Sequence, residues 1–136
     1  MSMLHVRVRV AGEDYALPVA DVLEIAEFGE IAPVPGATAA VLGIRNLRGQ
    51  VLPVVDLAGV LGLAPTAAPE RIVIADEGGR RAGLAVDAVA GVEQLPAATE
   101  DAESPHLKGA ALAAGGLVGM VDVASVLDAA QEGSVR

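Results

Sequence analysis

Two aspartates that each close an apolar run are the first residues to consider for chemistry. Asp56 follows the run 51–55, and Asp122 follows the run 117–121. One aspartate from each of two similar lobes would resemble the carboxylate pair of an aspartic protease, which shares one proton. That dyad requires Ser or Thr and then Gly after each Asp, whereas Leu-Ala and Val-Ala stand here. We therefore expect both aspartates to be structural N-caps of short helices. A small aspartic hydrolase is kept as an alternative.

The other candidates for catalysis lack partners in the sequence. His5 lies on the polar side of an alternating run and His106 follows a proline. Neither has the spacing of a metal site or of a Ser-His-Asp triad, so both are expected at the solvated surface. The chain contains no cysteine, which excludes a thiolate nucleophile and a disulfide framework. The sequence predicts no enzyme activity, no cofactor and no metal.

Composition excludes several classes of partner. Nine Lys and Arg against 18 Asp and Glu give a net charge of −9, which argues against nucleic acid and against an anionic membrane surface. The longest uncharged stretch, 31–44, has 14 residues and two prolines, whereas a membrane-spanning helix needs roughly 20 apolar residues. With 53% hydrophobic and 1% aromatic residues, we expect an aliphatic core. The expected protein is cytoplasmic, without nucleic-acid binding or direct membrane insertion.

Alternation of apolar and polar residues predicts a chain of short strands rather than long helices. Pro53 cannot donate a ladder hydrogen bond, so its strand should be an edge or carry a bulge there. Short helices are expected over 57–62 and 124–131, and a linker over 64–69. The predicted strands cover 4–10, 15–19, 22–28, 51–55, 71–76, two strands within 81–95, and 117–121.

An internal repeat indicates how these elements are organised. Shifted by 66 residues, Gly43–Leu61 lies on Gly109–Leu127 with 7 identities in 19 positions, where about two are expected by chance, and self-similarity at a fixed offset is architectural evidence. We predict one domain over 1–136 with two all-β lobes, roughly 15–65 and 71–125, completed by the terminal segments. The residues assigned to structure are Gly43, Gly49, Pro53, Asp56 and Asp122.

Polar residues present in only one half are candidates for function, because the repeated fold does not require them. Arg48 aligns with Ala114, Asn46 with Leu112, and Glu24 with Gly91. Arginine is common at interaction hot spots. Two interpretations of Arg48 stay open on spacing alone: an ion pair within its own lobe, or an anchor for a partner.

The segment 43–57 carries the run GIRNLRGQVLPVVDL, with Tyr15-Ala16-Leu17-Pro18-Val19 and Val22-Leu23-Glu24-Ile25 before it. Gly83-Leu84-Ala85-Val86-Asp87 and a strand ending in Asp122 follow in the same order. This series strongly resembles the chemotaxis coupling protein (CheW) family, over nearly the whole chain.

The resemblance implies an all-β fold of two SH3-like five-stranded β-barrel subdomains that share a hydrophobic core, with short helices. It also implies a non-catalytic adaptor between the cytoplasmic tip of methyl-accepting chemoreceptors and the regulatory domain of a CheA-type histidine kinase, associated with receptor arrays. The receptor tip would dock in a groove between the lobes. A regulatory module of another two-component pathway, for motility or pili, is the alternative. The implied partner-binding residues are Val22, Glu24 and Arg48, to which we add Asn46 and Leu47 of the same motif.

Overall fold

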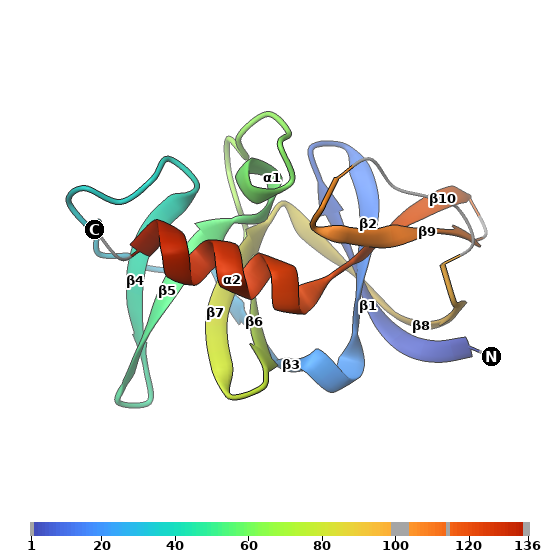
Figure 1. Cartoon of the computed structure of the whole chain (residues 1–136), viewed down its shortest axis with the longest axis horizontal. Helices are drawn as coiled ribbons and strands as arrows, with labels where there is room; N and C mark the ends of the chain where they lie inside the picture. The colour runs from blue at the N-terminus through green and yellow to red at the C-terminus, as the bar shows by residue number, and fades with distance from the viewer. Residues whose placement is uncertain (1, 99–103, 114, 135–136) are drawn as a thin grey trace.

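The computed structural model describes residues 2–98, 104–113 and 115–134, which form short strands followed by one longer helix (Figure 1). The elements in chain order are β1 (Ser2–Val10), β2 (Glu13–Pro18), the 3₁₀ turn η1 (Val19–Asp21), β3 (Val22–Glu27), β4 (Val41–Leu47), β5 (Gln50–Asp56), α1 (Leu57–Val60), β6 (Arg71–Glu77), β7 (Arg80–Val86), β8 (Ala88–Pro96), β9 (Leu107–Ala113), β10 (Gly116–Val121) and α2 (Val123–Ser134). Every predicted strand is present. The strands over 41–47 and 107–113 were not predicted.

The strands form two five-stranded sheets with the same internal plan. The central sheet has the order β3-β6-β7-β5-β4, and the terminal sheet has the order β8-β1-β2-β10-β9. Each contains one parallel pair, β5 with β7 and β10 with β2. In the described residues no ladder joins β3 to β4 or β8 to β9, so each SH3-like unit is an open sheet. The predicted all-β class with two five-stranded units is confirmed.

The sheets divide the chain differently from the lobes expected over 15–65 and 71–125. The central sheet is built from 22–86 alone, and the terminal sheet combines 2–18 with 88–121. The repeat correctly matches β4–β5 with β9–β10 and β3 with β8. It does not predict which additional hairpin completes each five-stranded sheet. The β6–β7 hairpin joins the strands before it, and β1–β2 joins the last three strands. The offset in sequence is therefore real, while the boundary drawn from it was wrong.

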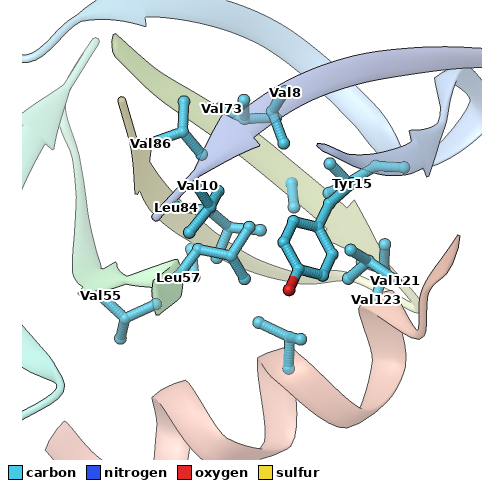
Figure 2. Packing of buried hydrophobic residues seen from close by; sticks show 14 of the residues in the cluster. Val8, Val10, Tyr15, Val55, Leu57, Val73, Leu84, Val86, Val121 and Val123 are labelled. Carbon is cyan, nitrogen blue, oxygen red and sulfur yellow. The ribbon is translucent and has the colours of Figure 1, made fainter. Parts of the chain in front are cut away.

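A shared core lies between the sheets and under α2. It draws aliphatic side chains from β1, β2, β5, β6 and β7 and from the last helix, with the single tyrosine, Tyr15, among them (Figure 2). Two smaller clusters fill the individual sheets, one around Leu95 and Met120 and one around Leu52 and Ile72. Burial of this apolar area is the main stabilising contribution to such a fold. The shared core expected from the resemblance is present.

The helix α2 fastens one sheet to the other. It follows β10 of the terminal sheet but packs across β4–β7 of the central sheet (Figure 1). Val126, Leu127 and Ala130 form its buried stripe, at the three-to-four-residue spacing of an amphipathic helix. Asp122 acts as predicted, because its Oδ1 accepts a hydrogen bond from the Ser125 amide at 3.2 Å, which caps the helix.

Asp56 behaves differently from its counterpart. It occupies the N-cap position of α1, but its side chain makes no cap hydrogen bond. Instead Oδ2 accepts from the Thr66 amide at 3.0 Å, while Oδ1 is buried and has no hydrogen-bond partner among the described residues. The capping prediction for Asp56 is therefore wrong in its side-chain chemistry. The carboxylate holds the long connection between α1 and β6, which passes close to the end of β5.

The two histidines are less exposed than predicted. His5 is only 6% exposed, and its Nδ1 lies 2.9 Å from the Met3 carbonyl oxygen. Because Val6 beside it is also buried, both faces of β1 are covered at this point, and alternation does not identify a solvated side. His106 is half-buried with Nδ1 2.6 Å from Ser125 Oγ. Both histidines are part of the packing rather than the solvated surface. No helix in the described residues is long and apolar enough to span a membrane.

Candidate functional site

At the tip of the β4–β5 hairpin, Arg48 adopts a left-handed backbone conformation that arginine does not favour. Arg48 and Gly49 both have positive φ, 51° and 84°, the geometry of a two-residue type I′ turn, and Asn46 Oδ1 accepts from the Gly49 amide at 3.0 Å. Asn or Gly is preferred at the first of these positions, and a left-handed residue with a Cβ costs about 1–2 kcal/mol. Since the turn does not select arginine, we look for the reason in the side chain.

The Arg48 side chain reaches across the open end of the central sheet. Its Nη2 lies 2.8 Å from Glu24 Oε2, although β3 and the hairpin come from opposite edges of the sheet. The side chain of Arg48 is 78% exposed and that of Glu24 is 23% exposed. An ion pair so accessible to water stabilises a fold by about 0–1 kcal/mol. The pair within the lobe exists, and a guanidinium with five N–H donors still has donors facing solvent.

A shallow groove surrounds this ion pair. It is lined by Leu23, Glu24, Leu47, Arg48, Gln50 and Arg81. Leu23 and the nearby strand residues Ile25 and Val51 are large apolar side chains left exposed. Apolar side chains next to arginine are the composition enriched in protein interfaces. The groove therefore has the composition of a surface that binds another protein.

The structure brings together three of the five predicted partner-binding residues. Glu24, Leu47 and Arg48 line the same groove. Asn46 is exposed beside it, with its side-chain oxygen engaged by the turn. Val22 is half-buried against the shared core, so it supports β3 from behind and does not line the groove.

Sequence reasoning missed Gln50 and Arg81 as members of this site. Arg81 Nε donates to Asp76 Oδ2 at 2.6 Å, and its Nη1 donates to Gln50 Oε1 at 2.7 Å. The available signal was the alternation after the predicted turn at 77–80, where Arg81 precedes the buried Ala82. That pattern predicts that Arg81 lies on the outer face of its strand. It does not predict that Arg81 lies next to the β4–β5 hairpin, which is distant in the sequence.

The residues assigned to structure support the hairpin. A Cβ at Gly43 would lie 2.2 Å from the Ala32 carbonyl oxygen, because 31–32 passes along β4 and pairs with Ile44 through two backbone hydrogen bonds. Pro53 is not on an edge strand, but an irregularity of the ladder lies beside it, where β4 shifts register between Val41 and Gly43. Pro53 precedes Val54–Asp56, the residues of β5 that pair with β7, so its missing N–H falls where β5 pairs only with β4.

A second groove lies between the terminal sheet and the turn that follows α1. Its lining includes Tyr15 of β2, Leu61 and Leu63 after α1, His106 just before β9, and Leu117 of β10. The Tyr15 hydroxyl donates to Glu13 Oε2 at 2.9 Å. Burial, with a smaller contribution from Glu13, raises the pKa of Tyr15 to about 12. The phenol is therefore neutral at physiological pH, and it offers an amphipathic wall to this groove.

Neither groove has the arrangement of a metal centre or of a carboxylate dyad. Among the described residues no three His, Cys, Asp or Glu side chains gather in a way that could hold a metal ion. Asp56 binds the Thr66 amide and Asp122 binds the Ser125 amide, and no hydrogen bond in the same part of the chain joins the two carboxylates. The fold that positions both grooves is a scaffold of two five-stranded sheets.

This scaffold has known relatives. The chain belongs to the CheW-like domain family, which matches residues 5–131. It is 32% identical over 128 residues to the chemotaxis protein CheW of Rhizobium meliloti, covering 87% of this chain and 83% of that one. The crystal structure of the scaffolding protein TtCheW from Thermoanaerobacter tengcongensis superimposes with a TM-score of 0.80 at 28% identity, covering 89% of this chain and 84% of the other.

Relatives with other names match as well. Protein PilI of Pseudomonas aeruginosa is 33% identical over 104 residues, which are 75% of this chain, and the chain spans only 58% of the length of PilI. Protein FrzA of Myxococcus xanthus is 29% identical over 138 residues, covering 93% of this chain and 86% of FrzA. The resemblance seen in the sequence is thus confirmed at the level of the family.

Proposed function

We propose that residues 1–136 act as one CheW-like adaptor that couples methyl-accepting chemoreceptors to the regulatory domain of a CheA-type histidine kinase, without catalysis. The observation that carries the proposal is the exposed Arg48 at a turn whose backbone favours a different residue. Local conflicts of this kind are found at functional sites. Arg48 stands beside apolar side chains on an acidic protein, where a mostly solvated guanidinium can donate to a partner's carboxylate or carbonyl oxygens.

The two grooves suit a molecule with two partners. The second groove, lined by apolar side chains such as Leu61 and Leu117 together with Tyr15 and several charged and polar side chains, is proposed to receive the helical tip of a receptor. The groove around Glu24 and Arg48 is proposed as the part of this protein's binding surface that transmits the state of the receptor to the kinase. Each contact is expected to be weak alone, since exposed ion pairs and shallow apolar grooves give modest affinity. We place the protein in the cytoplasm, at receptor arrays.

A second candidate concerns the pathway rather than the mechanism. The matches to PilI and FrzA are as extensive as some matches to chemotaxis proteins named CheW. They favour, as an alternative, coupling in a related two-component pathway for surface motility or pili. The aspartic hydrolase has no comparable support, because each aspartate is committed to a separate backbone amide.

Co-sedimentation with receptor membranes tests the proposal. Membranes containing a chemoreceptor are mixed with the full-length kinase of the same organism, with and without this chain, and the pelleted kinase is measured. The kinase should pellet with receptor membranes only when the chain is present, and receptor-free membranes serve as the control. Absence of any chain-dependent pelleting, for chemotaxis and motility pairs alike, contradicts the proposal. Pelleting with one pair alone identifies the pathway.

A further inference from the structure

The β4–β5 hairpin projects beyond the part of the sheet that holds it. The ladder between β5 and β7 covers only Val54–Asp56, so the hairpin from Leu47 to Pro53 pairs only within itself. Figure 1 shows the tip extending away from β7. The direction in which the tip presents Arg48 must therefore be fixed by side chains.

Below the tip, the hairpin is anchored by Arg45, whose Nη1 donates to the carbonyl oxygens of Glu27 and Phe28, and by Leu47, which packs on the buried cluster around Leu52. Two polar side-chain links reach the tip itself. Arg48 itself reaches β3 through Glu24 at 2.8 Å. Gln50, the residue paired with Leu47 across the turn, accepts from Arg81 Nη1 at 2.7 Å. Arg81 is in turn fixed by Asp76, its register partner on β6, through Nε at 2.6 Å. A chain of polar contacts thus runs from β6 through β7 to the tip.

We propose that Arg81 is a positioning residue for the partner-binding site: held by Asp76, it orients the hairpin tip through Gln50 and so sets the direction from which Arg48 meets a partner. The inference rests on the proposed role of Arg48. A planar guanidinium that uses Nε for one partner and Nη1 for another fixes both directions at once, which a lysine ammonium on a flexible stem does not.

The neighbouring arginine provides a matched control. Arg80 precedes Arg81 on the same strand, but its side chain turns to α2, where it pairs with Asp128 and lies 3.4 Å from the Ala124 carbonyl oxygen. The two residues have similar accessibility, with side chains 34% and 39% exposed. Replacing either by Ala removes one positive charge from the start of β7. Only Arg81→Ala removes the link to the tip.

The test uses the whole chain and two readouts. Amide hydrogen exchange of 46–50 and the Arg48 side-chain Nε–H resonance report on the free protein, and co-sedimentation of kinase with receptor membranes reports on binding. Gln50→Ala and Arg81→Ala should each raise exchange at the tip about two- to fivefold, the size expected for losing a half-exposed charge-assisted hydrogen bond. Both should shift the Arg48 resonance and weaken binding. Arg80→Ala should leave the tip unchanged, and Gln50→Glu, which keeps an acceptor for Arg81, should keep the wild-type rate of amide exchange at the tip.

Each outcome separates the explanations. If Arg81→Ala weakens binding while Gln50→Ala does not, Arg81 contacts the partner directly and the positioning role is wrong. Unchanged tip exchange in both variants also overturns it. If the wild type binds no receptor and kinase pair, the proposed function fails, while the exchange and resonance data still decide whether Arg81 orients the tip.

Discussion

The β4–β5 hairpin of the central sheet and the β9–β10 hairpin of the terminal sheet occupy the same place in the strand order but present opposite chemistry. In one, Asn46 pairs across the ladder with Val51, and in the other Leu112 pairs with Leu117. The two leucines are 69% and 60% exposed. The same scaffold thus carries a polar tip with an arginine in one sheet and an apolar pair in the other. Surface chemistry is set by the residues at the tip and not by the strand plan.

The neighbouring hairpins, β6–β7 in the central sheet and β1–β2 in the terminal sheet, carry opposite charges at equivalent positions. The parallel ladders give the equivalence, since Val54 pairs with Gly83 in one sheet and Met120 with Ala16 in the other. Two residues before Gly83 stands Arg81, and two residues before Ala16 stands Asp14, so these two positions are equivalent. Arg81 pairs across its hairpin with Asp76, and Asp14 pairs with Arg9. The residue nearest the tip is a cation in the central sheet and an acid in the terminal sheet. A link such as Arg81 to Gln50 therefore belongs to one sheet only.

The largest expected effect comes from a contact found in the central sheet. Gly43→Ala would place a Cβ 2.2 Å from the Ala32 carbonyl oxygen, so the segment bridging Ile44 must be displaced. We expect a loss of about 3 kcal/mol or more in the free energy of unfolding, measured by urea denaturation. Gly59→Ala is the control, because its Cβ would meet Ala40 at an ordinary 3.4 Å. A loss below about 1 kcal/mol would show that the bridge on β4 is dispensable.

An alkaline effect should originate from the terminal sheet. Tyr15 has a pKa raised to about 12, chiefly by burial, from 10.0, whereas its counterpart in the central sheet is the buried Ala82. Because the raised pKa favours the neutral form in the folded state, the stabilisation is complete below pH 10 and is lost as pH rises to 12. The loss should be at most about 2–3 kcal/mol.

Ultraviolet absorbance of the phenolate, together with urea denaturation across this range, measures the alkaline effect, and the chain has one tyrosine. Tyr15→Phe should remove most of the loss. If Tyr15→Phe keeps the full alkaline loss, another group is responsible.

The two hairpin tips can be made more alike by substitution at Arg48. Arg48→Ala should leave the free energy of unfolding within about 0.5 kcal/mol, because the ion pair with Glu24 is mostly in water. Binding in the co-sedimentation assay should weaken by an equivalent of about 2 kcal/mol, as at hot spots. The residue aligned with Arg48, Ala114, lies outside the described residues. A marked loss of stability would instead make Arg48 a scaffold residue.

Arg48→Gly sharpens this test, because glycine relieves the left-handed backbone. It should gain up to about 1 kcal/mol of stability while still losing binding. Effects of opposite sign on stability and binding exclude a purely structural role for the side chain.

The smallest expected effects distinguish the two aligned aspartates. Asp122→Ala should cost about 1 kcal/mol by removing the cap of α2, with faster amide exchange at the start of that helix. Asp56→Ala should cost about 1 kcal/mol as well, by removing the acceptor of the half-buried Thr66 amide, with faster exchange in 62–70. Asn at either position keeps an acceptor and should be nearly neutral. Exchange that rises in α1 but not near Thr66 would restore the capping role of Asp56.

Local sequence patterns predicted where the strands lie better than they predicted which strands pair with one another. Alternation identified β1, an apolar run after a turn identified β5, and the repeat identified equivalent hairpins, because each of these signals is carried by short stretches of sequence. Which hairpin completes which sheet depends on pairings such as Tyr15 with Gly119, and no local pattern encodes them. The strands β4 and β9 were not predicted, since glycines and polar residues interrupt their apolar pattern.

The candidate site was only partly predictable for the same reason. The motif in 43–57 pointed to Arg48, and the difference between the halves pointed to Glu24, but neither showed that these side chains meet. Their contact requires opposite edges of one sheet to approach each other. Arg81 was missed because it joins the site through Gln50 from a distant strand. Asp56 was misassigned because its partner, Thr66, lies in a connection without a strong pattern.

The division of strands between the sheets has a consequence for synthesis. The central sheet is one continuous segment, 22–86, whereas the terminal sheet needs the first hairpin and the last one. Domains fold from the N-terminus as the chain is made, and contacts between distant segments form slowly. On the ribosome, the central sheet can therefore assemble first. The β1–β2 hairpin is synthesised earlier, but the edge of β2 that pairs with β10 stays unpaired until β10 is made. Only when β10 emerges beside β2, with α2 directly behind, can the second sheet form and be fastened to the first.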